Sequence, residues 1–270
     1  MCVSNNLSLE KTMSQIEIEE VSVCDSVDES VNNSHAGNFD ANNTATATLT
    51  APAFVMPFEY APDEIYPVEN IGEIKPKIFY SFVKRTFDIF ASLFGLLLMA
   101  FPMLVIAIAI KCDSKGKVFY SQERLGLNGK KFMLVKFRSM REDAEKDGAK
   151  WSDGDNDDRI TKVGKFLRKT RLDELPQLWA CFIGTLSLIG PRPEREIFYN
   201  EFEKHVPGFS QRLLVKPGLT GLAQVSGGYN LRPEEKVVHD IEYIKNRSVW
   251  LDIKILFKTV KVVFSHDGAK

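Results

Sequence analysis

The sequence is poor in the residues that build metal centres and disulfide frameworks. It has four cysteines and four histidines in 270 residues. The cysteines, Cys2, Cys24, Cys112 and Cys181, lack the spacing of a zinc site, and scattered cysteines are typical of a reducing compartment. No nucleic-acid-reading motif or clustered basic patch is present, so nucleic acid is not an expected partner.

The first 56 residues have little positive charge. They contain one lysine and eight acidic residues, a net charge of −7, which leaves +6 on residues 57–270 of a chain whose total is −1. The stretch is rich in Asn, Ser, Thr and Ala and has neither the basic start nor the apolar core of a signal peptide. Such a segment buries too little apolar surface to fold. We therefore expect a disordered acidic tail over residues 1–56, followed by a linker over residues 57–77.

Residues 89–110, IFASLFGLLLMAFPMLVIAIAI, form a 22-residue run without charge. Pro102 divides the run into arms of 13 and 8 residues, each too short to span about 30 Å as a helix. Both flanks, Lys84-Arg85 and Lys111, are basic, which favours the cytoplasmic side. We expect residues 78–112 to form a re-entrant membrane helix-break-helix with the break at Pro102. A kinked transmembrane helix and a buried core helix are the alternatives.

The C-terminal stretch SVWLDIKILFKTVKVVFSHDG predicts an amphipathic helix. One side carries lysines, and the other carries apolar residues: Trp250, Ile253, Leu256, Val260, Val263 and Phe264. A basic amphipathic helix is typical of the membrane interface. An ordinary core-facing helix has the same pattern.

Residues 113–270 predict a compact, mainly helical α+β domain. Asn128-Gly129, between the strand-like segments 118–120 and 132–137, indicates a hairpin. ITKVGKFLRKT, residues 160–170, predicts an amphipathic helix, and the GPRP turn at 190–193 is stiff and presents Arg192. The acidic loop WSDGDNDDR lacks the Gly and Glu of a calcium loop.

Two adjacent carboxylates, Asp173 and Glu174, follow the basic run Arg168-Lys169-Thr170-Arg171 and precede Pro176. Because proline is tolerated in a first turn, a helix should begin close to Asp173. Acidic residues at a helix start can serve as caps. Arginines nearby also suit phosphate groups, and a carboxylate can accept a phosphoryl group as a nucleophile. The residues therefore indicate phosphoryl chemistry at a membrane surface.

The chain resembles the bacterial sugar transferase family, the monotopic phosphoglycosyl transferases, over about residues 78–265. The matching segments, in order, are KRTFDIFAS, the apolar run with its proline, QERLG, KFRSM, DRITKVGKFLRKTRLDELPQLW, LSLIGPRP, KPGLTGLAQVSG and LDIKIL. The family implies a cytoplasmic-face enzyme of the bacterial inner membrane that depends on Mg²⁺. It transfers a sugar 1-phosphate from a UDP-sugar to polyprenyl (undecaprenyl) phosphate and initiates exopolysaccharide or capsule synthesis.

The resemblance assigns roles to individual residues. Asp173 would be the nucleophile on the β-phosphate, releasing UMP and leaving a phosphosugar-aspartate, and it would be the protein's Mg²⁺ ligand. Glu174 would take the proton from the polyprenyl phosphate or orient it. Further substrate contacts are expected from Lys136, Arg138, Arg168, Arg171, Pro191, Arg192 and Gln224. For Lys136 and Arg138 a solvated hairpin face is the alternative. Arg192 is expected at the nucleotide end of the UDP-sugar, with a structural ion pair as the alternative. For Gln224 the alternative is a turn hydrogen bond.

The sequence departs from the family pattern in three ways. Larger relatives carry transmembrane helices before the catalytic domain, and residues 1–77 contain none, so the chain resembles the minimal form. Phe101 precedes Pro102 where a small polar residue is common. Gly228 stands where some relatives have an arginine, so a phosphate contact is either missing there or supplied by Arg232.

Two other functions stay open at this point. One is a membrane glycosyltransferase that releases UDP, and the other is a non-catalytic membrane adaptor. Candidate partners besides the UDP-sugar, the polyprenyl phosphate and the bilayer are a second copy of the chain and downstream glycosyltransferases.

Overall fold

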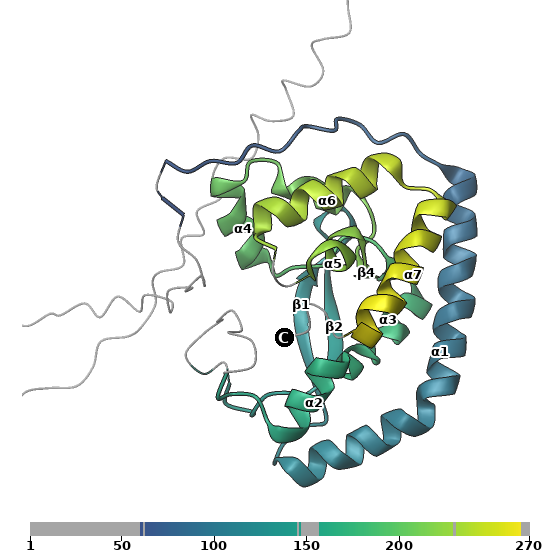
Figure 1. The fold of residues 1–270 in the computed structure, drawn as a ribbon, viewed down its shortest axis with the longest axis vertical. Helices are drawn as coiled ribbons and strands as arrows, with labels where there is room; N and C mark the ends of the chain where they lie inside the picture. Colours follow the sequence, from purple (N-terminus) through teal and green to yellow (C-terminus); the bar gives the residue numbers. More distant parts are fainter. Residues whose placement is uncertain (1–59, 62, 145, 147–156, 229–230, 266–270) are drawn as a thin grey trace, which may run out of the picture. The chain divides into compact units, whose positions relative to one another are not determined.

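The computed structural model describes residues 60–61, 63–144, 146, 157–228 and 231–265. The expected tail and most of the acidic loop lie outside these residues. The described part is mainly helical with two small sheets, as expected of an α+β domain (Figure 1). Its helices are α1 (Ile78–Asp113), α2 (Lys162–Thr170), α3 (Gln177–Ile183), α4 (Glu196–His205), α5 (Leu222–Ser226), α6 (Pro233–Asn246) and α7 (Val249–Ser265).

The hairpin prediction is confirmed. Strands β1 (Phe119–Leu125) and β2 (Lys131–Phe137) are antiparallel and longer than the sequence indicated. The 3₁₀ turn η1 (Leu127–Gly129) joins them, with φ of 55° at Asn128 and 73° at Gly129. These left-handed conformations are why an Asn-Gly pair marks such a turn.

A second sheet was not foreseen from the sequence. Strands β3 (Ser187–Ile189) and β4 (Gly218–Thr220) pair in parallel, and they belong to the segments LSLIGPRP and KPGLTG. The two backbones approach so closely that a Cβ atom at Gly218 would collide with the backbone nitrogen of Gly190. Both glycines are therefore required at this point, where the backbones of the two segments cross. The close backbone crossing fixes the turn that carries Arg192.

The main core lies between these small sheets and the surrounding helices. Its fully buried members include Cys181 of α3, Phe202 of α4, and Val237 and Ile244 of α6. The segment expected as a linker packs against this core through Val68, Ile71 and Ile74. Burial of this apolar surface is the main contribution to the stability of the domain.

The long apolar run lies within a single continuous helix, α1, with Pro102 inside it. Figure 1 shows that α1 bends, so that its second half turns toward α2. Proline removes a helical hydrogen bond and clashes with the preceding turn, which is the usual cause of such a bend. By length and composition, α1 is the one helix in the described part of the chain that meets the requirements for crossing a membrane.

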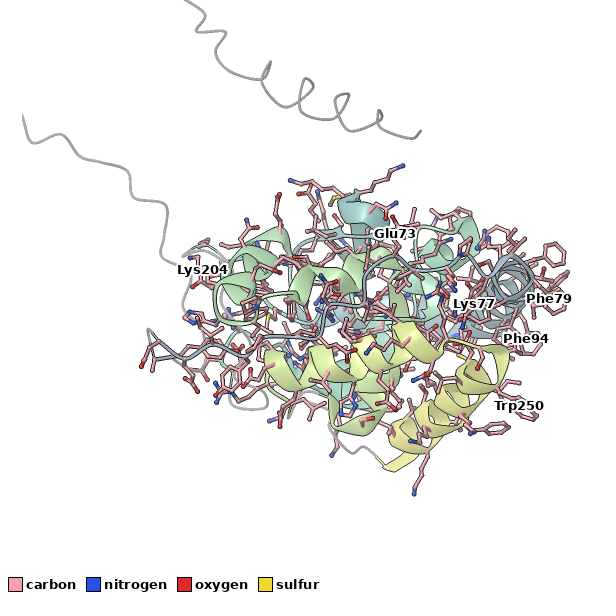
Figure 2. All side chains as sticks on the ribbon, turned by 90° about the horizontal axis from the view of Figure 1, so that it is seen from above. Glu73, Lys77, Phe79, Phe94, Lys204 and Trp250 are labelled. Carbon is pink, nitrogen blue, oxygen red and sulfur yellow. The ribbon has the colours of Figure 1, made fainter. Side chains whose placement is uncertain are left out.

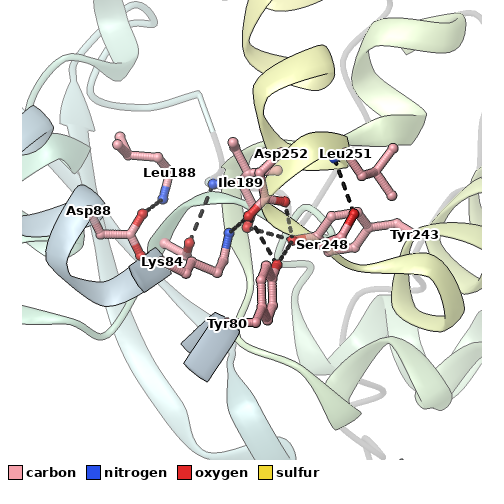
Figure 3. A network of polar contacts seen from close by, with 10 residues as sticks. Tyr80, Lys84, Asp88, Leu188, Ile189, Tyr243, Ser248, Leu251 and Asp252 are labelled. Atoms are coloured by element: carbon pink, nitrogen blue, oxygen red, sulfur yellow. Dashed lines mark hydrogen bonds and ion pairs between the residues drawn. The ribbon is translucent and has the colours of Figure 1, made fainter. Parts of the chain in front are cut away.

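Both halves of α1 are anchored to the same domain. In the first half, Asp252 of α7 accepts hydrogen bonds from Tyr80 and Lys84, at 3.0 and 2.9 Å, while Asp88 accepts one from the Leu188 amide at 3.0 Å (Figure 3). In the second half, Ile106 and Ile110 are buried against β2 and α2. The domain therefore holds α1 at both ends.

The C-terminal helix is amphipathic, and the residues of its apolar side differ in exposure. Trp250, Ile253 and Val260 are exposed, whereas Leu256 and Val263 are partly buried and turn toward α3 and β4. The predicted amphipathic helix is confirmed, and its apolar side is only partly covered by the domain. Figure 2 shows Trp250 of α7 and Phe79 and Phe94 of α1 projecting on the same side of the domain.

Candidate functional site

A left-handed residue positions the carboxylate pair. Helix α2 begins at its cap Thr161, whose hydroxyl accepts from the Gly164 amide, and ends at Arg171 with φ of 57°. The chain then forms the 3₁₀ turn η3 (Leu172–Glu174) before α3 begins at Gln177. The expected helix start is therefore later than Asp173, and neither carboxylate caps α3.

Asp173 lies in an environment that disfavours its charge. The side chain is buried, and burial raises the pKa of its carboxyl to about 6, with a further increase from the neighbouring Glu174. Lys136 and Arg168 oppose this rise through their positive charges. The carboxyl thus titrates close to physiological pH, a property that is frequent in catalytic groups.

Glu174 has the opposite behaviour because it is paired with an arginine. Arg192 donates to both carboxylate oxygens of Glu174, at 3.2 Å for Nη1 and more closely for Nη2. Burial alone would raise the pKa of Glu174, but the charge and hydrogen bonds of Arg192 lower it below its usual range. Adjacent carboxylates with pKa values moved apart are suited to different chemical roles.

The pair opens into a basic cavity of about 360 Å³. Twelve Lys and Arg side chains and four acidic ones line it, so the cavity favours an anionic ligand. It brings together most of the residues predicted to bind substrate: Lys136, Arg138, Arg168, Arg171, Arg192 and Gln224. Pro191 is outside the lining, and its carbonyl accepts a hydrogen bond from the Gly218 amide at 2.9 Å.

Arg138 and Gln224 differ in whether their side chains already have hydrogen-bond partners. The guanidinium of Arg138 donates to the carbonyls of Ser114 and Lys115, so it also joins the end of α1 to the hairpin. The amide of Gln224 is buried and has no hydrogen-bond partner for either its oxygen or its nitrogen among the described residues. The turn hydrogen bond given as the alternative for Gln224 is therefore not found among the described residues, and its amide is available to a ligand.

Arg232 does not replace the arginine missing at Gly228. It lies outside the cavity lining, forms an ion pair with Glu234 at 2.6 Å, and stacks over the ring of Tyr60. Gly228 itself lines the cavity.

Sequence reasoning missed several cavity residues on β1. Tyr120, Gln122 and Arg124 alternate along the strand and share its partly buried face, opposite Lys136 and its neighbours on β2. The signal was a period-two pattern with polar residues on the inner face, the reverse of an ordinary half-buried strand. Arg124 forms an ion pair with Glu194 at 2.8 Å, which connects the hairpin to the start of α4.

Arg212 was also missed, and it supports Arg192 from behind. It lies in the 3₁₀ segment η4 (Phe209–Leu214), pairs with the buried Asp240 at 2.7 Å, and donates to the Arg192 carbonyl at 2.9 Å. Lys236 of α6 lines the basic cavity together with Arg192 and Arg212, and burial lowers the pKa of its ammonium group. Their spacing from the carboxylate pair in sequence is too large for any local motif to reveal them.

No group of three or more His, Cys, Asp or Glu side chains suited to a metal ion is found in the part of the chain that the structure describes. Glu174 is occupied by Arg192, whereas Asp173 has no ion pair with a described residue. This donor set fits Mg²⁺ bound through one carboxylate and the oxygens of a bound phosphate, the usual arrangement in phosphoryl-transfer sites.

Known proteins are similar in sequence to most of this chain. Residues 79–266 match the family model described as "Bacterial sugar transferase". An Aeromonas hydrophila protein, named UDP-N-acetylgalactosamine-undecaprenyl-phosphate N-acetylgalactosaminephosphotransferase, is 41% identical over 204 residues, 74% of this chain and 48% of that protein. A Salmonella typhimurium undecaprenyl-phosphate galactose phosphotransferase is 41% identical over 202 residues, 70% of this chain and 42% of that protein. The match spans about half the length of these relatives or less, and the chain belongs to the bacterial sugar transferase family.

Proposed function

We propose that this protein transfers a sugar 1-phosphate from a UDP-sugar to a polyprenyl phosphate and so initiates exopolysaccharide or capsule synthesis. The observation that carries the proposal is a buried carboxylate with a raised pKa at the wall of a strongly basic cavity. The names of the relatives, which specify undecaprenyl-phosphate sugar-phosphate transfer, support the same reaction.

In the first step, a carboxylate oxygen of Asp173 attacks the β-phosphorus of the UDP-sugar. A P–O bond forms to Asp173, the bond from the β-phosphorus to the bridging oxygen breaks, and UMP leaves with that oxygen. Lys136 and Arg168 lie near Asp173 and would neutralise charge on the phosphate oxygens. Mg²⁺, held by Asp173 and substrate oxygens, would supply further neutralisation of phosphate charge.

In the second step, an oxygen of the polyprenyl phosphate attacks the phosphorus of the phosphosugar-aspartate. The bond to Asp173 breaks, the carboxylate is regenerated, and the product is a polyprenyl diphosphate sugar. Glu174 would orient the acceptor through Arg192 or take its proton. The lowered pKa of Glu174 makes it a weak base, and a phosphate monoester is largely dianionic at neutral pH, so there is little need for proton removal. Its contact with Arg192 therefore favours a role in orienting the acceptor.

The membrane helix is proposed to be re-entrant. The domain holds both ends of α1, while large apolar side chains along the middle of the helix are exposed, among them Phe90, Leu97, Phe101 and Leu104. A helix that crossed the bilayer would place its two ends on opposite sides, where one domain cannot contact both. A bent helix that enters and leaves through one leaflet satisfies both observations, and the basic flanks favour the cytoplasmic face.

The released nucleotide tests the proposed function. The purified protein in bilayer nanodiscs is incubated with a UDP-sugar, Mg²⁺ and undecaprenyl phosphate, and the products are separated. We expect UMP and a lipid diphosphate sugar. Release of UDP would indicate a glycosyltransferase that moves the sugar alone, and absence of any nucleotide product with a panel of UDP-sugars would indicate a non-catalytic adaptor.

A further inference from the structure

A second cavity adjoins the catalytic one and has a different character. It is a groove of about 210 Å³ between α3, β4 and α7. Leucine and valine side chains form most of its walls, including Leu178 of α3, Leu219 of β4, and Leu256 and Val263 of α7. Such a surface is suited to an apolar chain.

One end of the groove meets the carboxylate pair. Arg171, Glu174, Arg192 and Gln224 line both the groove and the basic cavity, so the two spaces are continuous there. The unpartnered, buried amide of Gln224 lies at this junction. Two arginines and an amide at the end of an apolar groove are complementary to a ligand with an anionic head and a hydrocarbon tail.

The walls of the groove belong to elements that also carry the exposed apolar surface. Trp179 and Ile183 of α3 are exposed, as are Trp250 and Phe257 of α7. Leu178, which lines the groove, also packs against Gly95 of α1. A Cβ atom added to Gly95 would lie only 3.1 Å from Cδ1 of Leu178. The groove therefore connects the carboxylate pair with the exposed apolar surface of α3 and α7.

We propose that this groove binds the first isoprenoid units of the lipid acceptor and places its phosphate between Arg171 and Arg192. The proposal rests on the proposed function, which supplies an acceptor of this chemistry. A nucleotide sugar has no hydrocarbon tail to cover the leucine and valine walls. An acceptor seated here would present its phosphate beside Glu174, which lines both the groove and the basic cavity.

The test compares two substitutions on the same helix. Val263→Trp fills the groove, whereas Val260→Trp adds the same ring at an exposed position of α7 outside it. Two rates are measured in nanodiscs: UMP release from the UDP-sugar without lipid acceptor, and transfer to undecaprenyl phosphate. We expect Val263→Trp to raise the KM for undecaprenyl phosphate at least tenfold and to leave the UMP burst unchanged, with both rates unchanged in Val260→Trp.

Cross-linking provides a readout that does not depend on a folded variant. A polyprenyl phosphate with a diazirine on its first isoprene unit should label residues 249–265 of the unmutated protein, and undecaprenyl phosphate should compete. An unchanged KM for undecaprenyl phosphate in Val263→Trp, or loss of its UMP burst, would overturn the groove assignment. Labelling of residues 249–265 to the same extent by a diazirine phosphatidic acid would overturn it as well. Failure of the unmutated protein to release UMP would instead refute the proposed function, and the cross-link would still decide what occupies the groove.

Discussion

The protonation state of Asp173 depends on a balance between burial, which favours its neutral form, and the cations that face it. Lys136 and Arg168 favour the carboxylate, and Glu174 opposes it. The sequence predicted the pair and its basic neighbours because they adjoin along the chain. It did not predict the difference between the two carboxylates, because that difference arises from Arg192, eighteen residues further on, and from burial.

Replacing Asp173 should have opposite effects on activity and stability. Asp173→Asn removes the nucleophile, so turnover should fall to background. The pKa of Asp173 in the folded state lies above the ordinary value of an aspartate. The protein therefore loses free energy of unfolding as pH rises from about 4 to 6, because the buried carboxyl must give up its proton, and the ionised carboxylate destabilises the fold above that window. Asp173→Asn should therefore raise the free energy of unfolding at pH 7.5 by roughly 1–3 kcal/mol, as measured by denaturant titration. Near-normal UMP release would disprove the assignment.

The pH dependence of the first step should reveal the same carboxyl. Single-turnover UMP release should decrease below about pH 6, where Asp173 becomes protonated. Glu174→Gln removes the adjacent negative charge and leaves the cation of Arg192 uncompensated, so both changes lower the pKa of Asp173. The acidic limb should then move to lower pH in Glu174→Gln and stay in place in Glu123→Gln, an exposed control. A limb that moved upward in Glu174→Gln would contradict this interpretation.

At the scale of elements, local patterns predicted local structure. The Asn-Gly hairpin, the amphipathic α2 and the C-terminal helix are encoded by neighbouring residues, and all three are confirmed. The parallel pair β3–β4 is not local, since its three-residue strands lie about thirty residues apart and have no periodicity of their own. The sequence showed the glycines and prolines of these segments, but their function as a backbone crossing required the structure.

That crossing can be tested by adding one methyl group. Gly218→Ala would place a Cβ against the backbone of Gly190, which cannot move without displacing the turn that carries Arg192. We expect a loss of about 1–3 kcal/mol in the free energy of unfolding, measured by thermal and denaturant unfolding. Gly129→Asn is the control, because this left-handed position opens to free space and asparagine tolerates it. Equal stability of the two variants would show that the crossing is not tightly packed.

At the scale of the whole molecule, α1 and the domain that holds the carboxylate pair form one unit. Arg85 donates to the carbonyls of Cys181 and Phe182 at the end of α3, so the membrane helix directly caps the helix that follows the carboxylate pair. The sequence predicted a membrane segment with a proline break, but these polar contacts, together with Asp88 and Leu188, join residues about one hundred positions apart. Such pairing has no local signature.

The re-entrant arrangement predicts where two cysteines can be labelled. The buried Cys181 is kept in all variants. Two positions are then tested in intact cells with an impermeant thiol reagent: Cys112 at the end of α1, and a new cysteine in place of the exposed Ser81. Both should be protected from the reagent. Both should react after permeabilisation. Pro102→Leu should straighten α1 and expose position 81 to the outside in a fraction of molecules. Labelling of either position in the protein with Pro102 intact would show an ordinary transmembrane helix.

The central claim is that Asp173 carries the sugar phosphate between the two substrates. The most direct measurement is mass spectrometry of the protein after brief incubation with a UDP-sugar and Mg²⁺, without lipid acceptor, followed by an acid quench and proteolysis. The account predicts that the peptide containing Asp173 gains the mass of a sugar phosphate, that undecaprenyl phosphate removes it, and that Asp173→Asn never acquires it. Complete transfer by the unmutated protein with no such adduct on any peptide, even at the shortest times, would contradict it.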